Sequence, residues 1–505
     1  MLATPVPPAF TLDDLTPVLL LGTLVLLVSV AAVRFAVRAG LPTLLLYLAI
    51  GLAIGNEGLG IRFDSAELTQ VLGYSALILI LAEGGLTTSW AGIRSAVAPA
   101  AVLSTIGVVV SVVVVGFAAH WILDVSLEIG FLVGAVVSST DAAAVFSVLR
   151  RVPLPARLSG VLEAESGFND APVVLLVVVL AHQAVPGAVH DPAWQLVLIA
   201  AGELAGGAAV GLAVGFLGGF VMRRAASTSS GLFSIGILSL TVLAYAVAVE
   251  IHASGFLATY VAALVLGNIA LPHRPAIRAF AQAMGWLAQI GLFVLLGLEA
   301  SPSQLVPQIV PAIAIGLVLL LVARPASVLL SMLPFPMPLR EQLFLSWAGL
   351  RGAVPVVLAT VPLTVGTPHT GWLFNLVFNL VIIFTIVQGP ALPWVARRLG
   401  ITGDHHTVDL ELETTPLEEL GADVLQVQVG PESQLHGVEV FELRLPVGAN
   451  VTLIVRDREA FVPDARTPLR RGDSLLIVTT GAARGRAEAR LRAVSERGRL
   501  AGWNQ

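Results

Sequence analysis

Two carboxylates, an amide and a hydroxyl stand together in the stretch Glu165-Ser166-Gly167-Phe168-Asn169-Asp170. The apolar run 173–180 follows, so these polar groups belong to a segment long enough to cross a bilayer. An ionisable side chain at membrane depth is costly unless it is paired or faces water, and it usually has a function. On a helix, Ser166 and Asp170 share one face, while Glu165 and Asn169 share a neighbouring one. We expect one face to hold a cation and the other a structural partner.

A second polar stretch, Ser138-Ser139-Thr140-Asp141-Ala142, interrupts the preceding apolar segment. Consecutive segments usually lie side by side, so we expect Asp141 and Asp170 to be neighbours. Carboxylate, hydroxyl and carbonyl oxygens replace the hydration water of a hard monovalent cation. Burial disfavours a bare carboxylate, so a buried aspartate holds either a proton or a cation, and this competition is an exchange mechanism. The alternative is a buried polar cluster that only fixes helix packing.

Arg324 and Arg351 lie inside apolar segments and need partners. Glu165 precedes Asp170 by five residues, about 140° round a helix, so it is predicted to form a structural ion pair with Arg324 instead of facing the cation. Arg351 is expected to compensate the ends of broken helices, and the alternative is that it extends to the membrane surface.

Three further acidic residues lie in or near these segments. Glu83, in Leu81-Ala82-Glu83-Gly84-Gly85, is interpreted either as part of a proton path or as a surface residue near the end of its segment. Glu163 and Glu203 lie near segment ends and are interpreted as surface residues. The nine histidines show no metal-ligand spacing, so no transition-metal site is predicted.

The composition is that of a polytopic membrane protein. The chain of 505 residues is 56% hydrophobic and 12% charged, with a mean hydropathy of +0.89, whereas soluble domains have about 25% charged residues. It has no cysteine, which excludes disulfides, thiolate metal sites and a cysteine nucleophile. All 28 basic residues are arginines, which excludes a Walker lysine and a Schiff-base lysine. Asp13 and Asp14 precede the first apolar run, unlike the basic start of a cleaved signal peptide.

Thirteen apolar segments precede residue 398, each near the roughly 20 residues of a membrane helix. Arginines cluster on alternate loops, which predicts an outside N-terminus and a cytoplasmic C-terminus by the positive-inside rule. The segments around Asp141 and Arg351 are polar or glycine-rich at mid-span, which indicates two broken helices in inverted repeats. The predicted segments are 16–34, 41–55, 68–90, 96–119, 127–149, 157–181, 195–221, 232–250, 254–271, 279–298, 305–331, 341–365 and 372–396.

The composition changes after Leu399. An acidic stretch, 399–420, is predicted to be a solvated linker. Residues 421–482 then alternate between apolar and polar side chains, with turn signals between the runs, and residues 483–505 form a closing helix and tail. The predicted strands of this small cytoplasmic α+β domain are 424–429, 438–445, 451–455 and 475–478.

These residues resemble the monovalent cation:proton antiporter family, in its NhaP-like branch with an Asn-Asp pair. Thr140-Asp141 is similar to the Thr-Asp motif of its unwound fifth helix, where Ala142 replaces the usual proline. The stretch 165–170 is similar to its sixth-helix motif, and Arg324 and Arg351 to arginines of later helices. The resemblance covers residues 15–398. It implies a homodimer with an elevator-like core, and electroneutral exchange.

The same resemblance implies a cation, K⁺ or Na⁺, held by Asp170, Asp141, Ser166 and the backbone of Thr140. Asn169 stands where electrogenic relatives carry a second aspartate, and we also expect it among the residues that bind the cation or the proton.

Residues 423–480 resemble the TrkA C-terminal (RCK-C) domain through 430–437, Leu443-Arg444-Leu445-Pro446 and Arg471-Gly472-Asp473. Such domains are common on potassium channels and transporters and dimerise, and some bind a nucleotide second messenger. The resemblance therefore favours potassium and leaves a nucleotide ligand open.

The leading hypothesis is an all-α membrane protein of the prokaryotic inner membrane that exchanges potassium for protons and is regulated by its cytoplasmic domain. A sodium/proton antiporter is the sibling hypothesis. A regulated cation channel is the alternative from another class, although the sequence lacks a Thr-Val-Gly-Tyr-Gly filter. A membrane enzyme finds little support, because no nucleophile and base are paired. The expected partners are the lipid bilayer, the cation, the proton and a second copy of the chain, with no nucleic acid.

Overall fold

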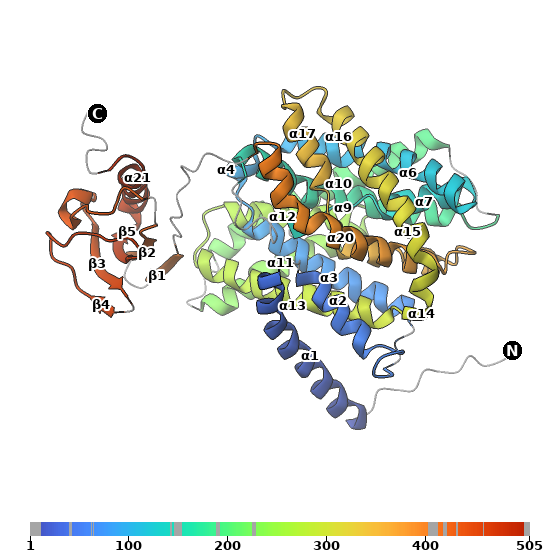
Figure 1. Ribbon diagram of the computed structural model, residues 1–505, viewed down its shortest axis with the longest axis horizontal. Coiled ribbons are helices and arrows are strands. Elements are labelled where there is room, and N and C mark those ends of the chain that lie inside the picture. The colour runs from blue at the N-terminus through green and yellow to red at the C-terminus, as the bar shows by residue number, and fades with distance from the viewer. Residues whose placement is uncertain are drawn as a thin grey trace. The chain divides into compact units, whose positions relative to one another are not determined.

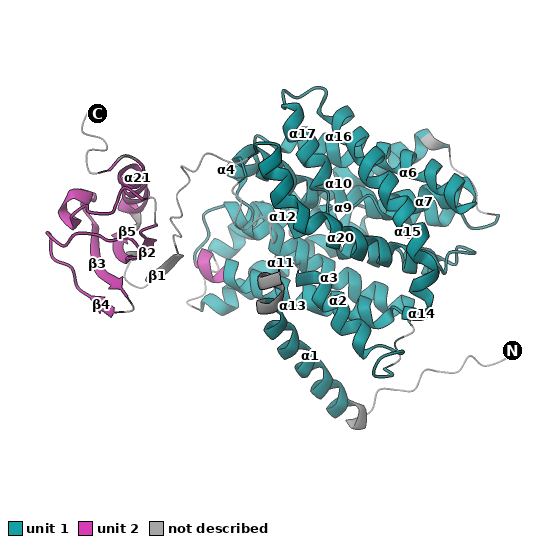
Figure 2. Cartoon of the chain, in the orientation of Figure 1, with its two compact units in different colours: residues 1–272, 278–401 teal, residues 273–277, 402–505 magenta. Residues whose placement is uncertain are grey.

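The chain forms two compact units, coloured separately in Figure 2: residues 1–272 with 278–401, and residues 402–505 with 273–277. The first unit is helical and the second contains a β-sheet (Figure 1). The division at Ile401 lies close to the predicted end of the membrane domain at residue 398. The computed structural model describes residues 12–39, 43–61, 63, 65–141, 144–145, 154–187, 192–224, 229–401, 413–417, 422–430, 433–457 and 459–498.

Helices make up the first unit, and two of them continue through a π-helical turn. The first half contains α1 (Leu12–Ala39), α2 (Thr43–Ile54), α3 (Ala66–Thr87), α4 (Trp90–Ile93), α5 (Val97–Val102), η1 (Leu103–Gly107), α6 (Val108–Leu123), α7 (Leu127–Val136), α9 (Ala156–Gln183) and α10 (Ala193–Arg224). The second half contains α11 (Ser230–Glu250), α12 (Gly255–Asn268), α13 (Arg274–Glu299), α14 (Pro302–Leu305), η2 (Val306–Gln308), α15 (Ile309–Val318), η3 (Leu319–Ala323), α16 (Arg324–Met332), α17 (Leu339–Trp347), α18 (Ala353–Leu358), α19 (Val361–Val365) and α20 (Leu373–Arg398).

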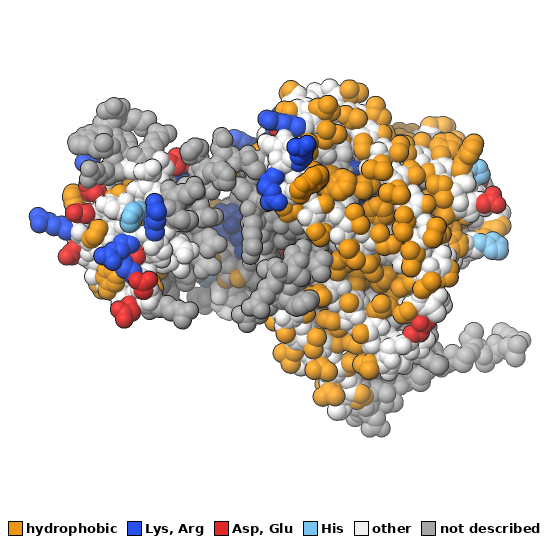
Figure 3. Space-filling model, in the orientation of Figure 1, with side chains coloured by type: hydrophobic (Ala, Val, Ile, Leu, Met, Phe, Trp, Pro, Cys, Tyr) orange, Lys and Arg blue, Asp and Glu red, His pale blue; other side chains and the backbone are white. Residues whose placement is uncertain are grey.

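Nine helical spans of the described residues are long and apolar enough to cross a membrane. Shorter apolar helices of 10–17 residues lie at 43–54, 127–136, 255–268 and 353–365, within the other predicted segments. Large hydrophobic side chains are exposed on the outer faces, as they would be against lipid, and Figure 3 shows them across one face of the first unit. The number of crossings, their orientation and the inverted repeat stay predictions.

Both segments predicted to be broken are interrupted. α7 ends at Val136, and residues 139–141 are non-helical. α17 ends at Trp347, and α18 begins at Ala353 after a non-helical stretch. Glycines at 349 and 352 explain this second break, because glycine disfavours a helix interior. Ala142 lies outside the described residues.

Small residues let the helices approach closely. On α10, Gly207 and Gly211 face α12. A β-carbon on Gly207 would lie 2.4 Å from the Ser254 carbonyl oxygen, and one on Gly211 would lie 2.6 Å from the Ala258 carbonyl oxygen. A spacing of four residues places both glycines on one face. Membrane helices lack a hydrophobic driving force for association, so backbone contact of this kind is a main source of packing energy.

The second unit is an antiparallel sheet in the order β1-β2-β5-β3-β4. α21 (Gly481–Arg497) packs against it through buried side chains at Ala487, Leu491 and Val494. The strands are β1 (Glu413–Leu417), β2 (Ala422–Gln428), β3 (Ala449–Arg456), β4 (Glu459–Phe461) and β5 (Ser474–Thr480).

Two predictions for this unit are wrong. Residues 413–417, assigned to the linker, form β1 and pair with β2. Residues 438–445, predicted to be a strand, contain the 3₁₀ helix η5 (Val440–Leu443). A capping box explains η5, because the Glu439 side chain accepts from the backbone of Glu442 while the Glu442 side chain accepts from the backbone of Glu439. A local bond of this kind outweighs a strand-like apolar pattern.

Asp473 fixes the turn before β5. Its buried carboxylate accepts from Arg456 Nε and Nη2 at 2.8 and 2.7 Å and from the Arg470 backbone N–H at 2.7 Å. Burial acts to raise the pKa of Asp473, but these hydrogen bonds and the charges of both arginines outweigh burial and leave the pKa below its usual value. The charged form is therefore the one that the fold stabilises.

We expect Asp473→Asn to destabilise the second unit by about 2–3 kcal/mol at pH 7, since hydrogen bonds to a charged group are lost. The stability that Asp473 contributes through its depressed pKa is complete above the unfolded-state pKa of about 3.9. It is lost as the pH falls through the folded-state pKa. The difference between variant and wild type should therefore shrink below about pH 4. The difference in stability is measured by hydrogen exchange of the β2 and β5 amides in the whole protein. The control is Asp457→Asn at an exposed position, and equal protection at pH 7 would contradict the prediction.

Candidate functional site

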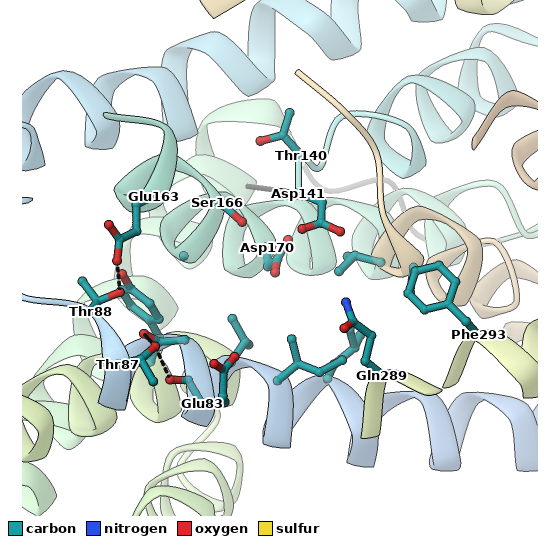
Figure 4. Close-up of a pocket in the computed structure, with 18 of the residues that line it drawn as sticks. Glu83, Thr87, Thr88, Thr140, Asp141, Glu163, Ser166, Asp170, Gln289 and Phe293 are labelled. Atoms are coloured by element: carbon teal, nitrogen blue, oxygen red, sulfur yellow. Dashed lines mark hydrogen bonds between the residues drawn. The ribbon is translucent and has the colours of Figure 1, made fainter. Parts of the chain in front are cut away.

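A cavity of about 520 Å³ lies within the first unit, and both predicted aspartates face it (Figure 4). Asp170 comes from α9 and Asp141 from the non-helical segment after α7. One side of the cavity is formed by α9, residues 140–141 and α18, and the other by α3, α12 and α13. The polar lining consists of Glu83, Thr87, Thr88, Thr140, Asp141, Ser159, Glu163, Ser166, Asp170, Tyr260 and Gln289.

Asp170 is buried, and the hydroxyl of Ser139 donates a hydrogen bond of 2.6 Å to its Oδ1 atom. Ser166 lies one turn earlier on the same face of α9 and is half-buried. A serine hydroxyl can turn from donor to acceptor, so Ser139 can stabilise a bare carboxylate or offer its oxygen to a cation.

Asp141 is half-buried and is held through its backbone. Its N–H donates to the Leu350 carbonyl oxygen at 2.8 Å, which joins the two non-helical segments. Gly352 lies directly against its side chain, because a β-carbon there would come within 2.1 Å of Asp141 Oδ2. The break between α17 and α18 therefore also shapes the wall around this carboxylate.

A second polar cluster occupies the other face of α9. Arg324 Nη1 and Nη2 donate to Glu165 Oε1 and Oε2 at 2.6 and 2.8 Å, so the ion pair that the sequence predicts is present and bidentate. Thr140 Oγ1 donates to Glu165 Oε1 at 3.3 Å, and Asn169 Nδ2 donates to Thr140 Oγ1 at 2.6 Å. Asn169, predicted to bind the cation, is thus placed with the ion pair and does not line the cavity.

Arg351 is buried between the two breaks. Its Nε donates to the Val137 carbonyl oxygen at 3.3 Å, and Nη1 donates to the Gly349 carbonyl oxygen. Val137 is the C-terminal cap of α7, where unpaired carbonyl groups carry partial negative charge. Arg351 therefore lies where it compensates the end of a broken helix, and it does not extend to the surface.

The facing wall contributes two more carboxylates. Glu83 on α3 is half-buried, and the α13 backbone packs against it, because a β-carbon on Gly285 would lie 2.8 Å from Glu83 Cγ. Glu163 on α9 accepts a hydrogen bond from Thr88 Oγ1 across the cavity. Neither residue is an exposed surface residue, which corrects that interpretation for Glu163, while a proton path through Glu83 stays a prediction.

Sequence reasoning missed Ser139 and Glu163, although both left a signal. Ser139 and Thr140 are adjacent in a non-helical stretch, where successive side chains tend to point in opposite directions. Their partners are indeed different, Asp170 and Glu165. Glu163 precedes Ser166 by three positions and Asp170 by seven, the spacing of a single helical face.

Comparison with known proteins identifies both parts of the chain. Residues 24–398 match the family described as sodium/hydrogen exchanger, transmembrane, and residues 424–492 match the TrkA-C domain. The K(+)/H(+) antiporter NhaP of Alkalimonas amylolytica is 36% identical over 468 residues, covering 91% of this chain and 80% of its own. The K(+)/H(+) antiporter NhaP2 of Shewanella oneidensis is 35% identical over 485 residues, covering 92% and 82%. The Na(+)/H(+) antiporter NhaS2 of a Synechocystis strain is 30% identical, covering 79% and 74%.

The fold is also similar to that of a solved structure, the sodium proton antiporter MjNhaP1 from Methanocaldococcus jannaschii. The two superpose with a TM-score of 0.67 at 22% sequence identity. The match covers 76% of this chain and 99% of the other.

Glu165→Ala and Arg324→Ala should each destabilise the first unit by about 3–5 kcal/mol, because one charge is left buried without its partner. Thermal unfolding of the purified protein in detergent measures the loss. Arg397→Ala, at an exposed position near the end of α20, serves as the control. Melting temperatures equal to that of the wild type would show that the pair adds nothing to stability.

Proposed function

The chain belongs to the sodium/hydrogen exchanger family, and from this premise we propose that it is an electroneutral potassium/proton antiporter of a bacterial inner membrane. The observation that carries the proposal is the setting of Asp170. It is buried at a cavity with polar side chains in its lining, while two buried arginines are engaged elsewhere, Arg324 with Glu165 and Arg351 with carbonyl groups. Its charge is therefore left to be neutralised by a proton or by a cation.

Asp170, Asp141, Ser166 and Thr140 all line the cavity and offer oxygens to a cation. The Thr140 hydroxyl is already bonded to Asn169 and Glu165, which leaves its backbone carbonyl for the ion. Proton and cation compete for one carboxylate, so loading one displaces the other. Glu83 lines the same cavity and offers a relay for the proton.

We propose electroneutral exchange on the premise that, of the two carboxylates, Asp170 alone exchanges a proton for a cation. Asp170 carries one proton in one direction and one monovalent cation in the other, so the loaded site has the same charge both ways. Asn169 is neutral and donates to Thr140. Its position on this turn of α9 therefore carries no second carboxylate that could exchange a charge.

Potassium is favoured over sodium because two relatives with more than 90% coverage of this chain bear the name K(+)/H(+) antiporter. The oxygens at the site suit either ion, so the sodium/proton antiporter remains the second candidate. A homodimer with an elevator-like core is proposed from the family resemblance.

The second unit is proposed to regulate transport. It contains a cavity of about 600 Å³, and the polar residues of its lining include Arg444, Asn450, Thr452 and Asp464. A cavity of this size suits a small molecule.

Asp170→Asn should abolish exchange, because the amide cannot alternate between a proton and a cation. The exchange rate is measured in proteoliposomes that contain a pH-sensitive dye, with pulses of potassium, sodium, lithium and rubidium at zero voltage. Coupled proton movement indicates an antiporter, whereas current without proton movement indicates a channel. Asp124→Asn at an exposed site is the matched control, and full activity of Asp170→Asn would exclude the mechanism.

Removal of residues 407–505 should preserve exchange but alter its dependence on pH or on added ligand, because the transport residues all lie in the first unit. Exchange rates of the truncated and complete proteins are compared between about pH 6 and 9, a range that brackets the neutral pH of most cytoplasms. A truncated protein that folds but does not transport would contradict a purely regulatory role.

A further inference from the structure

An antiporter must expose Asp170 to each side of the membrane in turn, so contacts across the cavity must break during transport. We propose that the hydrogen bond between Thr88 and Glu163 is a latch that holds α9 against the end of α3 in the present state and opens in every cycle. This inference rests on the proposed function and extends it to two residues outside the cation site.

Thr88 is a fixed point on its wall. It is the buried C-terminal cap of α3, and its backbone N–H donates to the Gly84 carbonyl oxygen. Its own carbonyl oxygen accepts from Asn268 Nδ2 at 2.9 Å, and Asn268 Oδ1 accepts from the Trp90 N–H at 2.8 Å. Asn268 at the end of α12 thus fixes the end of α3. The Thr88 hydroxyl is therefore a hydrogen-bond donor whose backbone is held in place.

The neighbouring contact between α9 and α12 has a different character. The ring of Tyr260 lies on Gly167, where a β-carbon would come within 2.3 Å of the ring, and meets Phe168 edge to face at 5.7 Å. The Tyr260 hydroxyl makes no hydrogen bond to α9, so van der Waals packing and ring geometry alone hold this contact. The directional hydrogen bond at Glu163 therefore specifies the position of α9 along this wall.

Glu163 and Glu165 show why one contact can open and the other cannot. Glu165 is fully buried and makes two bonds to a charged arginine, whose separation would strand both charges. Glu163 is half-buried, lines the cavity and accepts a bond from a neutral hydroxyl. Water in the cavity can replace that single bond, so the latch is reversible.

The location of the latch is also suited to gating. Ser159 and Asp170 both line the cavity, and their separation of eleven residues spans about 16 Å along α9. Glu163 lies between the two, toward the end of α9 that carries the exposed Arg157. By the positive-inside rule this is the cytoplasmic end, so the latch holds the state in which the cavity extends toward the cytoplasm.

The absence of cysteine from the chain allows a direct test. In Thr88→Cys/Glu163→Cys, a short bis(methanethiosulfonate) reagent would join the two walls, because it forms one reducible disulfide with each cysteine and releases methanesulfinate. The chain contains no other thiol. We expect linking to reduce potassium/proton exchange in proteoliposomes at least tenfold, and reduction to restore it. Exchange that persists in fully linked protein would overturn the latch while leaving the proposed function intact.

Two controls separate the latch from simple blockage. Thr88→Cys/Asn268→Cys places both thiols on one wall, so linking there should leave exchange unchanged within twofold. A monofunctional methanethiosulfonate of similar size on Glu163→Cys should also leave more than half of the exchange rate that the same variant shows before modification. Inhibition as deep as with the crossed link in either control would overturn the proposal. Absence of exchange in the wild type would instead refute the proposed function.

A second measurement needs no crosslinker. Thr88→Val removes the donor with little change of volume, whereas Thr88→Ser retains it. We expect Thr88→Val to change the maximal exchange rate at least threefold, with the KM for potassium within twofold of wild type, and Thr88→Ser to match wild type. Equal maximal rates in the wild type and both variants, or a change confined to KM, would contradict a latch that acts on the conformational step.

Discussion

Non-helical backbone buried among membrane helices is the constraint on which the rest of the first unit depends. Each broken helix ends in carbonyl groups that lipid cannot satisfy, so protein groups must do so. At the end of α7, Arg351 donates to the Val137 carbonyl oxygen. At the end of α17, Gln388 Nε2 donates to the Trp347 carbonyl oxygen at 3.0 Å. The N–H of Asp141 joins the two breaks by donating to the Leu350 carbonyl oxygen. The same residue therefore lines the candidate site and satisfies the backbone of the broken helices.

The helix α9 meets this constraint by separating its acidic residues between two faces. The face of Glu165 and Asn169 is closed by Arg324 and Thr140 and serves stability. The face of Glu163, Ser166 and Asp170 lines the cavity in which we propose that exchange takes place. Adjacent positions thus have unlike functions, because successive residues on a helix lie about 100° apart.

Much of this arrangement could be predicted from the sequence, because apolar length and helical spacing are local properties. They give the positions of the long helices, the separation of Glu165 from Asp170, and the proximity of the two aspartates. The donors to the broken ends could not all be predicted, since Gln388 lies forty-one positions from its acceptor. Glu163 was wrongly interpreted as a surface residue because it lies near the end of its segment. Its spacing from Ser166 and Asp170, which places all three on one helical face, predicts the cavity instead.

The second unit shows the same limit at smaller scale. Alternating residues predict β2, β3 and β5, which form the centre of the sheet. β1 was missed because its sequence, Glu413-Thr-Thr-Pro-Leu417, is polar and contains proline. Such residues are tolerated at the edge of a sheet, where one side of the strand makes no ladder bonds. Edge strands are therefore poorly predicted from composition, since pairing with β2 determines them.

Charge balance joins the fold to the proposed exchange. Moving one net charge across a membrane costs about 2.3 kcal/mol for each 100 mV of potential. Glu165 is neutralised by Arg324, and Asp170 by whichever ion it carries. In the proposed exchange, α9 would therefore carry the same net charge with a proton as with a cation, and voltage would favour neither direction. Only the two concentration gradients would then drive the exchange, and the neutral Asn169 fits this proposal.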